Sequence, residues 1–221
     1  VAPSTNDRII EIVAYDWDDA SGVVTRTINI LPDNEEPVLA AIEGTTFAYT
    51  EGDGEVPFTS TITVSDTDDT NLESATIQIT GNYFLGEDEL TFTNANGISG
   101  SFQASTGTLS LTGSSSVANY QTALRPVNDN NLSSDPLTSL DRTVTITVND
   151  GTNDSNTQQR DISVTATNTA PLLASIESDL LLYTAGASLD VSNTITVNDF
   201  DNTDIATATI QITGNYDSAE D

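Results

Sequence analysis

The sequence predicts an all-β sandwich with one short inserted helix. Short runs of alternating apolar and polar residues recur along the chain, such as Thr-Ile-Thr-Val at 61–64, and a period of two is typical of half-buried strands. Segments rich in Gly, Asn, Asp and Ser separate these runs, and one stretch alone has helical spacing. Many short strands, turn-rich connections and a single helix favour a sandwich with Greek-key topology.

An internal repeat organises the chain. Residues 61–83 recur as residues 194–216 with 16 of 23 positions identical, and 37–40 match 171–174. A repeat of this period overrides the domain count that the length suggests. We therefore expect the C-terminal part of a preceding repeat at 1–36, a complete repeat at 37–170, and the N-terminal part of a following repeat at 171–221. The chain is interpreted as a segment of a longer tandem array.

The first 36 residues predict a hairpin. Strands are expected at 8–14 and 23–30, joined by an acidic loop at 15–22 and followed by a linker at 31–37 that contains two prolines. In the repeat alignment, Tyr15 and Asp16 fall on Asn149 and Asp150. Trp17 falls on Gly151, so it has no repeat counterpart, and we expect it to pack over the hairpin.

The complete unit predicts a succession of strands. The alternating runs lie at 38–42, 47–49, 61–64, 74–80, 89–93, 98–103, 108–112, 142–148 and 160–165, with turns at 51–54, 94–97 and 105–107. The helix is expected at 115–124, where a serine can cap it and Val117, Tyr120 and Leu124 share one face. Pro126 disfavours helical geometry at Arg125. The repeated tyrosines, Tyr49 with Tyr183 and Tyr83 with Tyr216, are expected to pack rather than to contact a ligand.

Composition excludes several classes of function. The chain has 34 acidic residues against five cationic ones, all arginine, and a formal net charge of -29. This balance argues against nucleic acid and anionic membranes as partners, because both need basic patches. The chain contains no His, Cys or Met, so disulfides, thiol catalysis and Ser-His-Asp triads are excluded, whereas hard cations that prefer oxygen ligands are not. No apolar run approaches the length of a membrane-spanning segment.

The combined pattern resembles a known family. An acidic loop, the ATIQITGNY strand, the segment FTNANGISGSFQASTGTLSLTGSSSVANYQTALRPV, and then RTVTITVNDG with a linker ending in proline follow one another. This order resembles the cadherin-like repeats of very large bacterial surface adhesins. The resemblance implies immunoglobulin-like sandwiches stacked end to end, with calcium at the junctions. The linkers depart from the animal cadherin pattern, and the second, at 167–171, has no acidic residue.

Oxygen-bearing side chains gather near both expected junctions. Calcium takes six to eight oxygen ligands, and carboxylates that share one pocket repel each other unless a cation is bound. The candidates for the first junction are Asp16, Asp18, Asp19, Asn34, Glu35, Glu36, Asp66, Asp68 and Asp69. The candidates for the second junction are Asn149, Asp150, Asn153, Asp154, Asn168, Asp199, Asp201 and Asp204. The alternative is that these residues only form turns, cap backbone amides and keep the chain soluble.

The sequence therefore predicts a structural, non-enzymatic function. We expect a calcium-stiffened stalk segment of a secreted or cell-surface bacterial adhesin, whose binding region lies elsewhere and whose partners here are neighbouring repeats. One alternative is a module that binds a cell-surface or matrix protein or a glycan through the loops at 15–22 or 128–137. Another is a non-catalytic spacer of a large secreted enzyme. Carboxylates that recur in turns do not favour a glycosidase pair, which is expected once and in a cleft.

Overall fold

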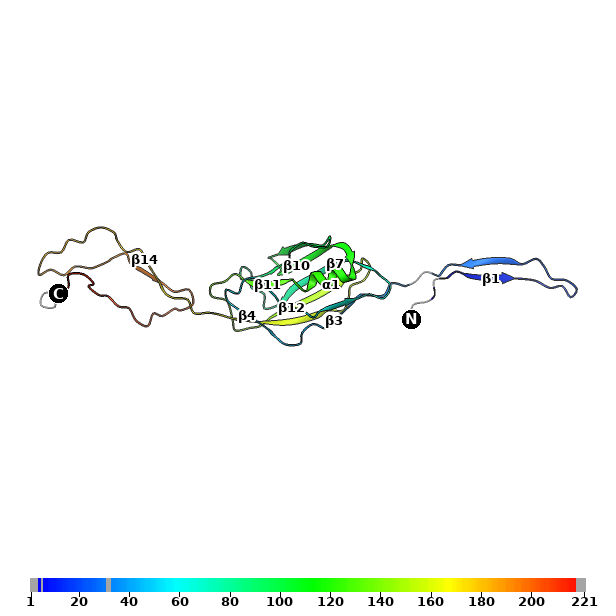
Figure 1. Cartoon of the computed structure of the whole chain (residues 1–221), viewed down its shortest axis with the longest axis horizontal. Helices are drawn as coiled ribbons and strands as arrows, with labels where there is room; N and C mark the ends of the chain where they lie inside the picture. Colours follow the sequence, from blue (N-terminus) through cyan, green and yellow to red (C-terminus); the bar gives the residue numbers. More distant parts are fainter. Residues whose placement is uncertain (1–3, 5, 31–32, 218–221) are drawn as a thin grey trace.

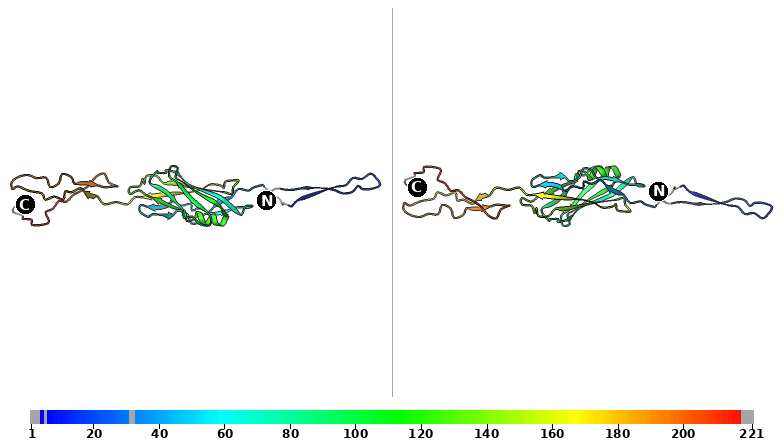
Figure 2. Two further views of the ribbon diagram at one scale, coloured as in Figure 1. Left: turned by 90° about the horizontal axis from the view of Figure 1, so that it is seen from above. Right: turned by 90° about the horizontal axis from the view of Figure 1, so that it is seen from below.

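The computed structural model describes residue 4 and residues 6–30 and 33–217. The chain is elongated, with a central body between a thin N-terminal hairpin and an open C-terminal segment (Figure 1). The views from above and below show the same arrangement (Figure 2). The first two residues of the expected linker at 31–37 lie outside the described residues.

A six-stranded sheet forms one layer of the central body. Its order is β4-β13-β12-β7-β10-β9, and all neighbouring strands are antiparallel except β4 and β13, which are parallel. The strands are β4 (Phe47–Thr50), β7 (Asn71–Gly81), β9 (Ser99–Gln103), β10 (Thr108–Ser116), β12 (Arg142–Asn149) and β13 (Gln158–Thr165).

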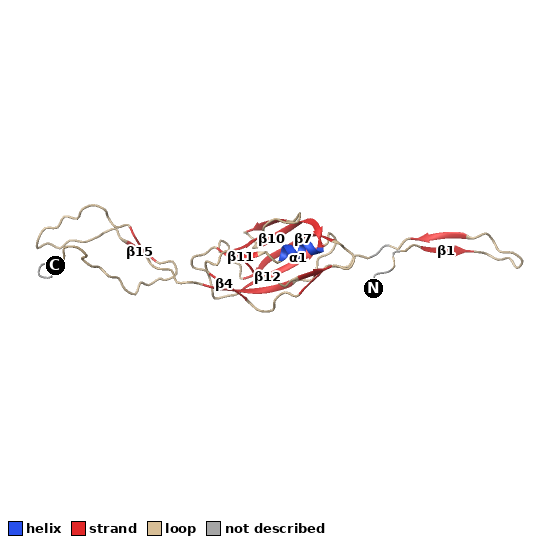
Figure 3. Ribbon diagram, viewed as in Figure 1, coloured by secondary structure: helices blue, strands red, loops and turns tan. Residues whose placement is uncertain are grey.

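Two smaller sheets and one helix cover the inner face of the large sheet (Figure 3). One small sheet has the order β5-β11-β8 and the other pairs β3 with β6. The elements are β3 (Val38–Ala40), β5 (Val56–Pro57), β6 (Thr63–Ser65), β8 (Asp88–Thr91), α1 (Val117–Leu124) and β11 (Asn128–Asn131). The described residues form a mostly β structure with one helix, which confirms the prediction of a mostly β fold.

The core lies between these layers. Along β7, Leu72, Ala75, Ile77 and Ile79 are buried, whereas the Thr and Gln side chains between them are not. This alternation is the expected consequence of period-two patterning in a strand with one face on the core. Side chains of β3, β4, β6, β8, β10, β12, β13 and α1 belong to the same cluster.

The helix has the predicted serine cap but begins two residues later than predicted, because Ser115 and Ser116 belong to β10. Ser116 has extended backbone angles and its Oγ accepts a hydrogen bond of 3.2 Å from the amide of Asn119. Tyr120 and Leu124 are buried, and Val117 packs at the edge of the core. No helix in the described ranges is long and apolar enough to cross a membrane.

Two short strands, β5 and β11, were not expected from the sequence. Residues 128–131 form β11, which pairs with β8 and β5, although the interval 128–137 was interpreted as a loop. Its sequence, Asn-Asp-Asn-Asn, has low strand propensity, and its pairing is decided by tertiary neighbours. Polar side chains on this strand bury into the interior rather than face solvent.

The N-terminal hairpin has the same register as the hairpin that closes the central unit. Strands β1 (Arg8–Ile12) and β2 (Val24–Ile28) pair Arg8 with Ile28, just as Arg142 pairs with Ile162 in β12 and β13. Its five-residue strands are exposed on both faces. Trp17 is fully exposed, so the expectation that it packs over the hairpin is wrong.

The C-terminal segment forms only part of what its sequence predicts. Strands β14 (Leu172–Ala174) and β15 (Thr196–Asn198) pair in the same register as β3 and β6. Residues 208–213, identical to 75–80 within β7, are not a strand here. In the complete unit β7 lies between β12 and β10, and residues 171–217 contain no counterpart of either strand. Tyr49 is buried on β4 beside β13, whereas Tyr183 and Tyr216 are exposed in a segment that has no counterpart of β13.

A buried arginine closes one end of the sandwich. Arg142 is 1% exposed, and its Nε lies 3.2 Å from the carboxylate of Asp88. Its Nη1 donates to the carbonyls of Leu137 and Leu140, and its guanidinium lies 5.2 Å from the ring centroid of Phe84. Through these contacts, Arg142 links the loop before β12 to strand β8.

Replacing Arg142 with methionine should destabilise the sandwich. Removing one partner of a buried ion pair leaves the other charge uncompensated, so we expect the free energy of unfolding to fall by about 3–5 kcal/mol. Urea unfolding followed by circular dichroism measures the change. Arg8→Met is the matched control, because Arg8 has the equivalent position in the exposed hairpin. A similar loss in both variants would contradict the assignment.

A second buried group makes stability depend on pH. Asp129 on β11 is 4% exposed. Burial and, next, the charge of Asp88 raise the pKa of Asp129 to about 7, although Arg142 acts in the opposite direction. The folded state therefore holds a proton that an unfolded aspartate releases near pH 4, so stability falls as pH rises from about 4 to 7.

Asp129→Asn should remove this dependence. The variant is expected to be more stable than the parent above pH 7, by at most about 4 kcal/mol, and nearly equal to it near pH 4. Urea unfolding of both proteins at pH 4 and pH 8 tests this. A difference that does not change between the two pH values would contradict the raised pKa.

Candidate functional site

The loop between β6 and β7 is folded around the carboxylate of Asp66. Its Oδ1 accepts hydrogen bonds from the amides of Asp68 (3.1 Å) and Asp69 (2.9 Å), which is the side-chain turn that aspartate commonly makes. Its Oδ2 is buried and has no hydrogen-bond partner. A buried carboxylate oxygen without a donor carries a desolvation cost that a cation could offset.

The loop between β12 and β13 is folded in the same way around Asp150. Its Oδ1 accepts from the amides of Thr152 (2.6 Å) and Asn153 (2.8 Å). Its Oδ2 accepts from the side-chain amide of Asn34 in the linker (2.9 Å). Asp150 therefore joins the tip of the closing hairpin to the linker that precedes the same unit.

Strand pairing brings these two loops together. β7 and β12 are antiparallel with Asn149 opposite Ser74, so the loop after β12 lies beside the loop before β7. As a result, carboxylate oxygens of Asp66, Asp69 and Asp150 all lie within 4.8 Å of one another, and all three residues are half-buried. We call these three residues the acidic cluster.

The acidic cluster is electrostatically unfavourable without a cation. Two carboxylates about 4 Å apart repel by about 4 kcal/mol at an effective dielectric constant near 20. Burial and the charges of Asp66, Asp68 and Asp150 together raise the pKa of Asp69. Burial also acts to raise the pKa of Asp150, but hydrogen bonds from Asn153, Asn34 and Thr152 outweigh it and the pKa is lowered. The cluster thus keeps negative charge at a half-buried position.

Backbone groups of the linker form hydrogen bonds with residues next to the acidic cluster. Both carboxylate oxygens of Asp68 lie 3.3 Å from the amide of Glu35, and the side chain of Asn153 donates to the carbonyl of Asn34 (3.5 Å). The side chains of Glu35 and Glu36 are exposed. Of the first-junction candidates, Asn34, Asp66, Asp68 and Asp69 therefore lie together, and both glutamates lie at the margin.

The N-terminal hairpin does not contribute the acids that were expected at this junction. Asp16, Asp18 and Asp19 lie in the exposed loop between β1 and β2, at the outer end of the molecule (Figure 1). The reason is geometric: β2 must run back to the linker, so the turn lies a full strand length away from it. The expected contact of these three residues with Asp66 is wrong, and Asp150 takes the place that was assigned to them.

The second linker repeats part of the first arrangement. Asp199 Oδ1 accepts from the amides of Asp201 (3.3 Å) and Asn202 (3.2 Å), and Asp201 Oδ2 accepts from the amide of Thr169 (2.7 Å). The side chain of Asn202 donates to Asn168 Oδ1 (3.3 Å). Asn202 stands where the first copy has Asp69, so this position offers an amide in place of a carboxylate, and Asp204 stands where the first copy has Asn71.

The expected second junction also needs a correction. Asn149, Asp150 and Asp154 belong to the closing hairpin, whose tip points back to the first linker and away from Asn168 and Asp199. Asp154 Oδ1 accepts from the side chain of Asn149 (2.7 Å) within that hairpin. Asp204 lines a surface hollow with Asn168, Asp199 and Asn202. Within the described ranges, the only close group of three acidic side chains is the acidic cluster.

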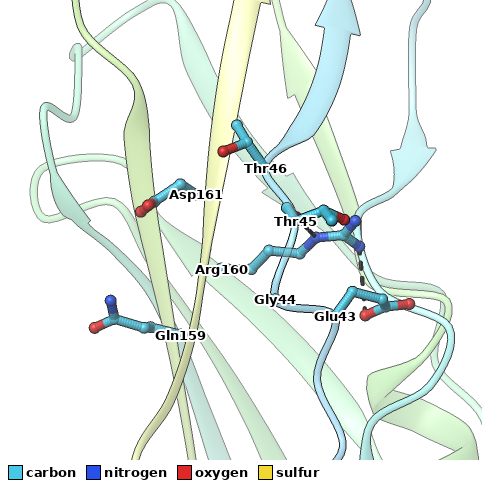
Figure 4. A pocket seen from close by; sticks show the side chains of 7 residues that line it. All are labelled: Glu43, Gly44, Thr45, Thr46, Gln159, Arg160 and Asp161. Atoms are coloured by element: carbon cyan, nitrogen blue, oxygen red, sulfur yellow. Dashed lines mark hydrogen bonds and ion pairs between the residues drawn. The ribbon is translucent and has the colours of Figure 1, made fainter.

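A polar hollow over β13 contains an ion pair. Arg160 at its centre forms an ion pair of 3.4 Å with Glu43 Oε2 and donates to the carbonyl of Thr45 (3.0 Å) (Figure 4). Burial acts to raise the pKa of Glu43, but hydrogen bonds from Thr59 and Ser60 outweigh it and lower the pKa to about 2. The two charges neutralise each other and join β13 to the loop before β4.

Known proteins offer one weak structural match to this chain. The chain matches no protein-family model and no curated protein. Among solved structures, it is similar to the structure of surface layer protein SbsC, domains 4-9, at 15% sequence identity and a TM-score of 0.23. The match covers 93% of this chain and 27% of that chain, so this chain spans about a quarter of that structure. A likeness at this TM-score says nothing about function.

Replacing Asp69 with asparagine should stabilise the protein when divalent cations are removed. The substitution removes one carboxylate whose pKa is raised by burial and by the charges of its neighbours, and it reproduces the residue found at the equivalent position, Asn202. We expect a higher Tm in excess chelator. Asp141→Asn is the control, because Asp141 is exposed and lies outside the cluster. An unchanged or lowered Tm for Asp69→Asn would show that the cluster is not under electrostatic strain.

Proposed function

We propose that this chain is a structural segment of the stalk of a secreted or cell-surface bacterial adhesin, built from cadherin-like repeats and stiffened by calcium. The observation that carries the proposal is the acidic cluster at the contact between the linker and the complete unit. Calcium is the cation that best fits these residues, because the available ligands are carboxylate and carbonyl oxygens and the chain has no His or Cys.

The strand order supports a cadherin-like or immunoglobulin-like unit with Greek-key topology. Strands β7, β12 and β13 are neighbours in the large sheet, which corresponds to the C-F-G order of immunoglobulin sandwiches. The linkers and the opening strands recur with the same hydrogen bonds, at Asp68 with Glu35 and at Asp201 with Thr169. This recurrence supports units joined end to end.

The proposed mechanism is electrostatic. Asp66, Asp69 and Asp150 would hold the ion, with Asp68 and the Asn34–Glu36 stretch beside them. Bound calcium neutralises their repulsion and links three separate segments: the linker, the loop before β7 and the tip of the closing hairpin. The angle between the preceding hairpin and the sandwich is thereby restricted. Without the ion, repulsion between the loops returns and the linker bends more freely.

Calcium titration and small-angle scattering test this function. We expect calorimetry to detect calcium uptake, with a dissociation constant of about 10⁻⁴–10⁻³ M if the site behaves as in other extracellular modules. Scattering should show a longer and more narrowly distributed maximum dimension in calcium than in chelator. Asp150→Asn should weaken uptake and abolish the scattering difference, whereas Asp141→Asn should leave both unchanged. Absence of uptake, together with identical scattering in calcium and chelator, would refute the proposal.

A further inference from the structure

Four leucine side chains are exposed at one end of the central sandwich. They belong to two loops, residues 82–87 between β7 and β8 and residues 132–141 between β11 and β12. Between residues 37 and 170, all of which the structure describes, Val38 is the one other large apolar side chain that is exposed. The four leucines are 38% to 70% exposed. We call them the leucine surface: Leu85, Leu132, Leu137 and Leu140.

Hydrogen bonds fix the two loops to each other. The amide of Leu132 donates to the carbonyl of Glu87 (2.7 Å), and the amide of Leu137 donates to Glu87 Oε2 (3.3 Å). Glu87 follows the remaining leucine of the surface by two residues. The carbonyls of Leu137 and Leu140 accept from the buried side chain of Arg142. The leucine surface is therefore carried by loops that are held in place by the sandwich.

The leucine surface lies where the chain passes to the following unit. β12 begins at Arg142, which pairs with Ile162 of β13. Leu140 precedes this pair by two residues, and β13 ends three residues after it, at Thr165. The second linker starts at that point, on the side of the sandwich that faces the C-terminal segment (Figure 1). The leucines therefore surround the exit of the linker.

An exposed aromatic residue of the following unit is tethered close to this surface. The amide of Thr167 donates to Glu51 Oε2 at the end of the sandwich (2.8 Å). The amide of Thr169 donates to Asp201 Oδ2 in the loop at 199–202 (2.7 Å). Two residues span at most about 7 Å, so this loop is held near the sandwich. Phe200 lies in the loop and is 53% exposed.

The exposure of Phe200 is a property of its position in the loop. Thr67 has the same position in the complete unit and is exposed there too, although β12 and β10 flank β7 in that unit. The carboxylates of its neighbours, Asp66 and Asp68, accept from amides of the loop and of the linker. A residue at this position is therefore left uncovered by its own unit.

The first junction has polar residues at both of the corresponding positions. In the repeat alignment, Asn6 takes the place of Leu140, and Thr67 takes the place of Phe200. Both polar side chains are exposed. In the described ranges three acidic side chains converge at the first junction, whereas the second linker, at 167–171, has no acidic residue. Apolar residues thus replace polar ones on both sides of the junction that lacks the acidic cluster.

We propose that Phe200 docks on the leucine surface, so that an apolar contact stiffens the second junction where calcium stiffens the first. The inference rests on the end-to-end arrangement of units proposed above, but it needs no calcium. Bending of the linker between Thr165 and Thr169 brings the ring onto Leu137 and Leu140. The occupant is this loop and not a second copy. A short tether gives an effective concentration on the order of millimolar, whereas copies with a charge of -29 repel each other.

Ionic strength sets the condition for the test. Glu51 and Asp201 carry negative charge on the two sides of the linker, and their repulsion opposes closure. In about 0.5 M NaCl this repulsion is screened beyond about 4 Å, whereas apolar burial is not weakened. The contact is therefore expected to be most complete in high salt, in chelator as well as in calcium.

Nuclear Overhauser effects test the contact directly. In the full chain, in chelator and high salt, we expect cross-peaks between the ring of Phe200 and the methyl groups of Leu137 or Leu140. The ring current should also shift these methyl signals upfield. Both effects should persist when calcium is added. Absence of any cross-peak between Phe200 and the leucine surface, in chelator and in calcium alike, would overturn the proposal.

Exposed-residue variants provide a second readout. Phe200→Thr and Leu140→Asn each introduce the residue of the first junction. Each should abolish the methyl shifts and lower the rotational correlation time of residues 172–198, measured by ¹⁵N relaxation, at least twofold. Val38→Asn is the matched control, because Val38 is an exposed apolar residue beside the other linker. Equal effects of Val38→Asn and Leu140→Asn would contradict the docking, and unchanged thermal unfolding of the sandwich serves as the folding control.

Asp150→Asn separates this contact from the calcium site. The variant should weaken calcium uptake at the first junction and leave the cross-peaks of Phe200 unchanged. Loss of the cross-peaks in Asp150→Asn would overturn the proposal that the contact is independent of calcium. Cross-peaks in a chain that takes up no calcium would refute the proposed function and support the apolar contact. Calcium uptake without cross-peaks would refute the apolar contact alone.

Discussion

The structure depends on one long-range pairing, that of β7 with β12. The same residues, Ala-Thr-Ile-Gln-Ile-Thr, form a strand at 75–80 and none at 208–213, and the difference between the two copies is the presence of β12 and β10 on either side. Local propensity is therefore insufficient to form this strand. The pairing also decides where the acids meet, since it sets the tip of the closing hairpin beside the loop that precedes β7.

The acidic turns themselves do not depend on that pairing. Asp16, Asp66, Asp150 and Asp199 each accept hydrogen bonds from the amides two and three residues further along the chain. Each turn is thus closed by hydrogen bonds within its own loop. Asp16 is exposed, whereas Asp66, Asp150 and Asp199 are half-buried. Only where β7 and β12 bring two such turns to one linker do three carboxylates converge. The crowding of carboxylates is a property of the assembled junction rather than of any single acidic loop.

Much of the fold could be predicted from the sequence because its signals are local. Period-two alternation identifies β7, β10 and β12, and a serine before Val117 identifies the start of the helix. The membership of the site could not be predicted in the same way. Chain order alone predicts that Asp150 lies at the following junction, but β12 is antiparallel to β7 and its end therefore lies at the start of its own unit. Strand β11 could not be predicted because its Asn and Asp residues are typical of turns. The exposure of Trp17 could not be predicted either, because an exposed aromatic residue at positive φ has no sequence signature.

The central claim is that β7–β12 pairing assembles a calcium site at the linker. Anomalous diffraction from crystals grown in calcium tests it most directly, because the ion is located without reference to its effect on shape or stability. The account predicts an anomalous peak among the carboxylates of Asp66, Asp69 and Asp150, next to Asn34. An empty cluster in crystals that hold calcium only at exposed turns, such as that of Asp16, would contradict it.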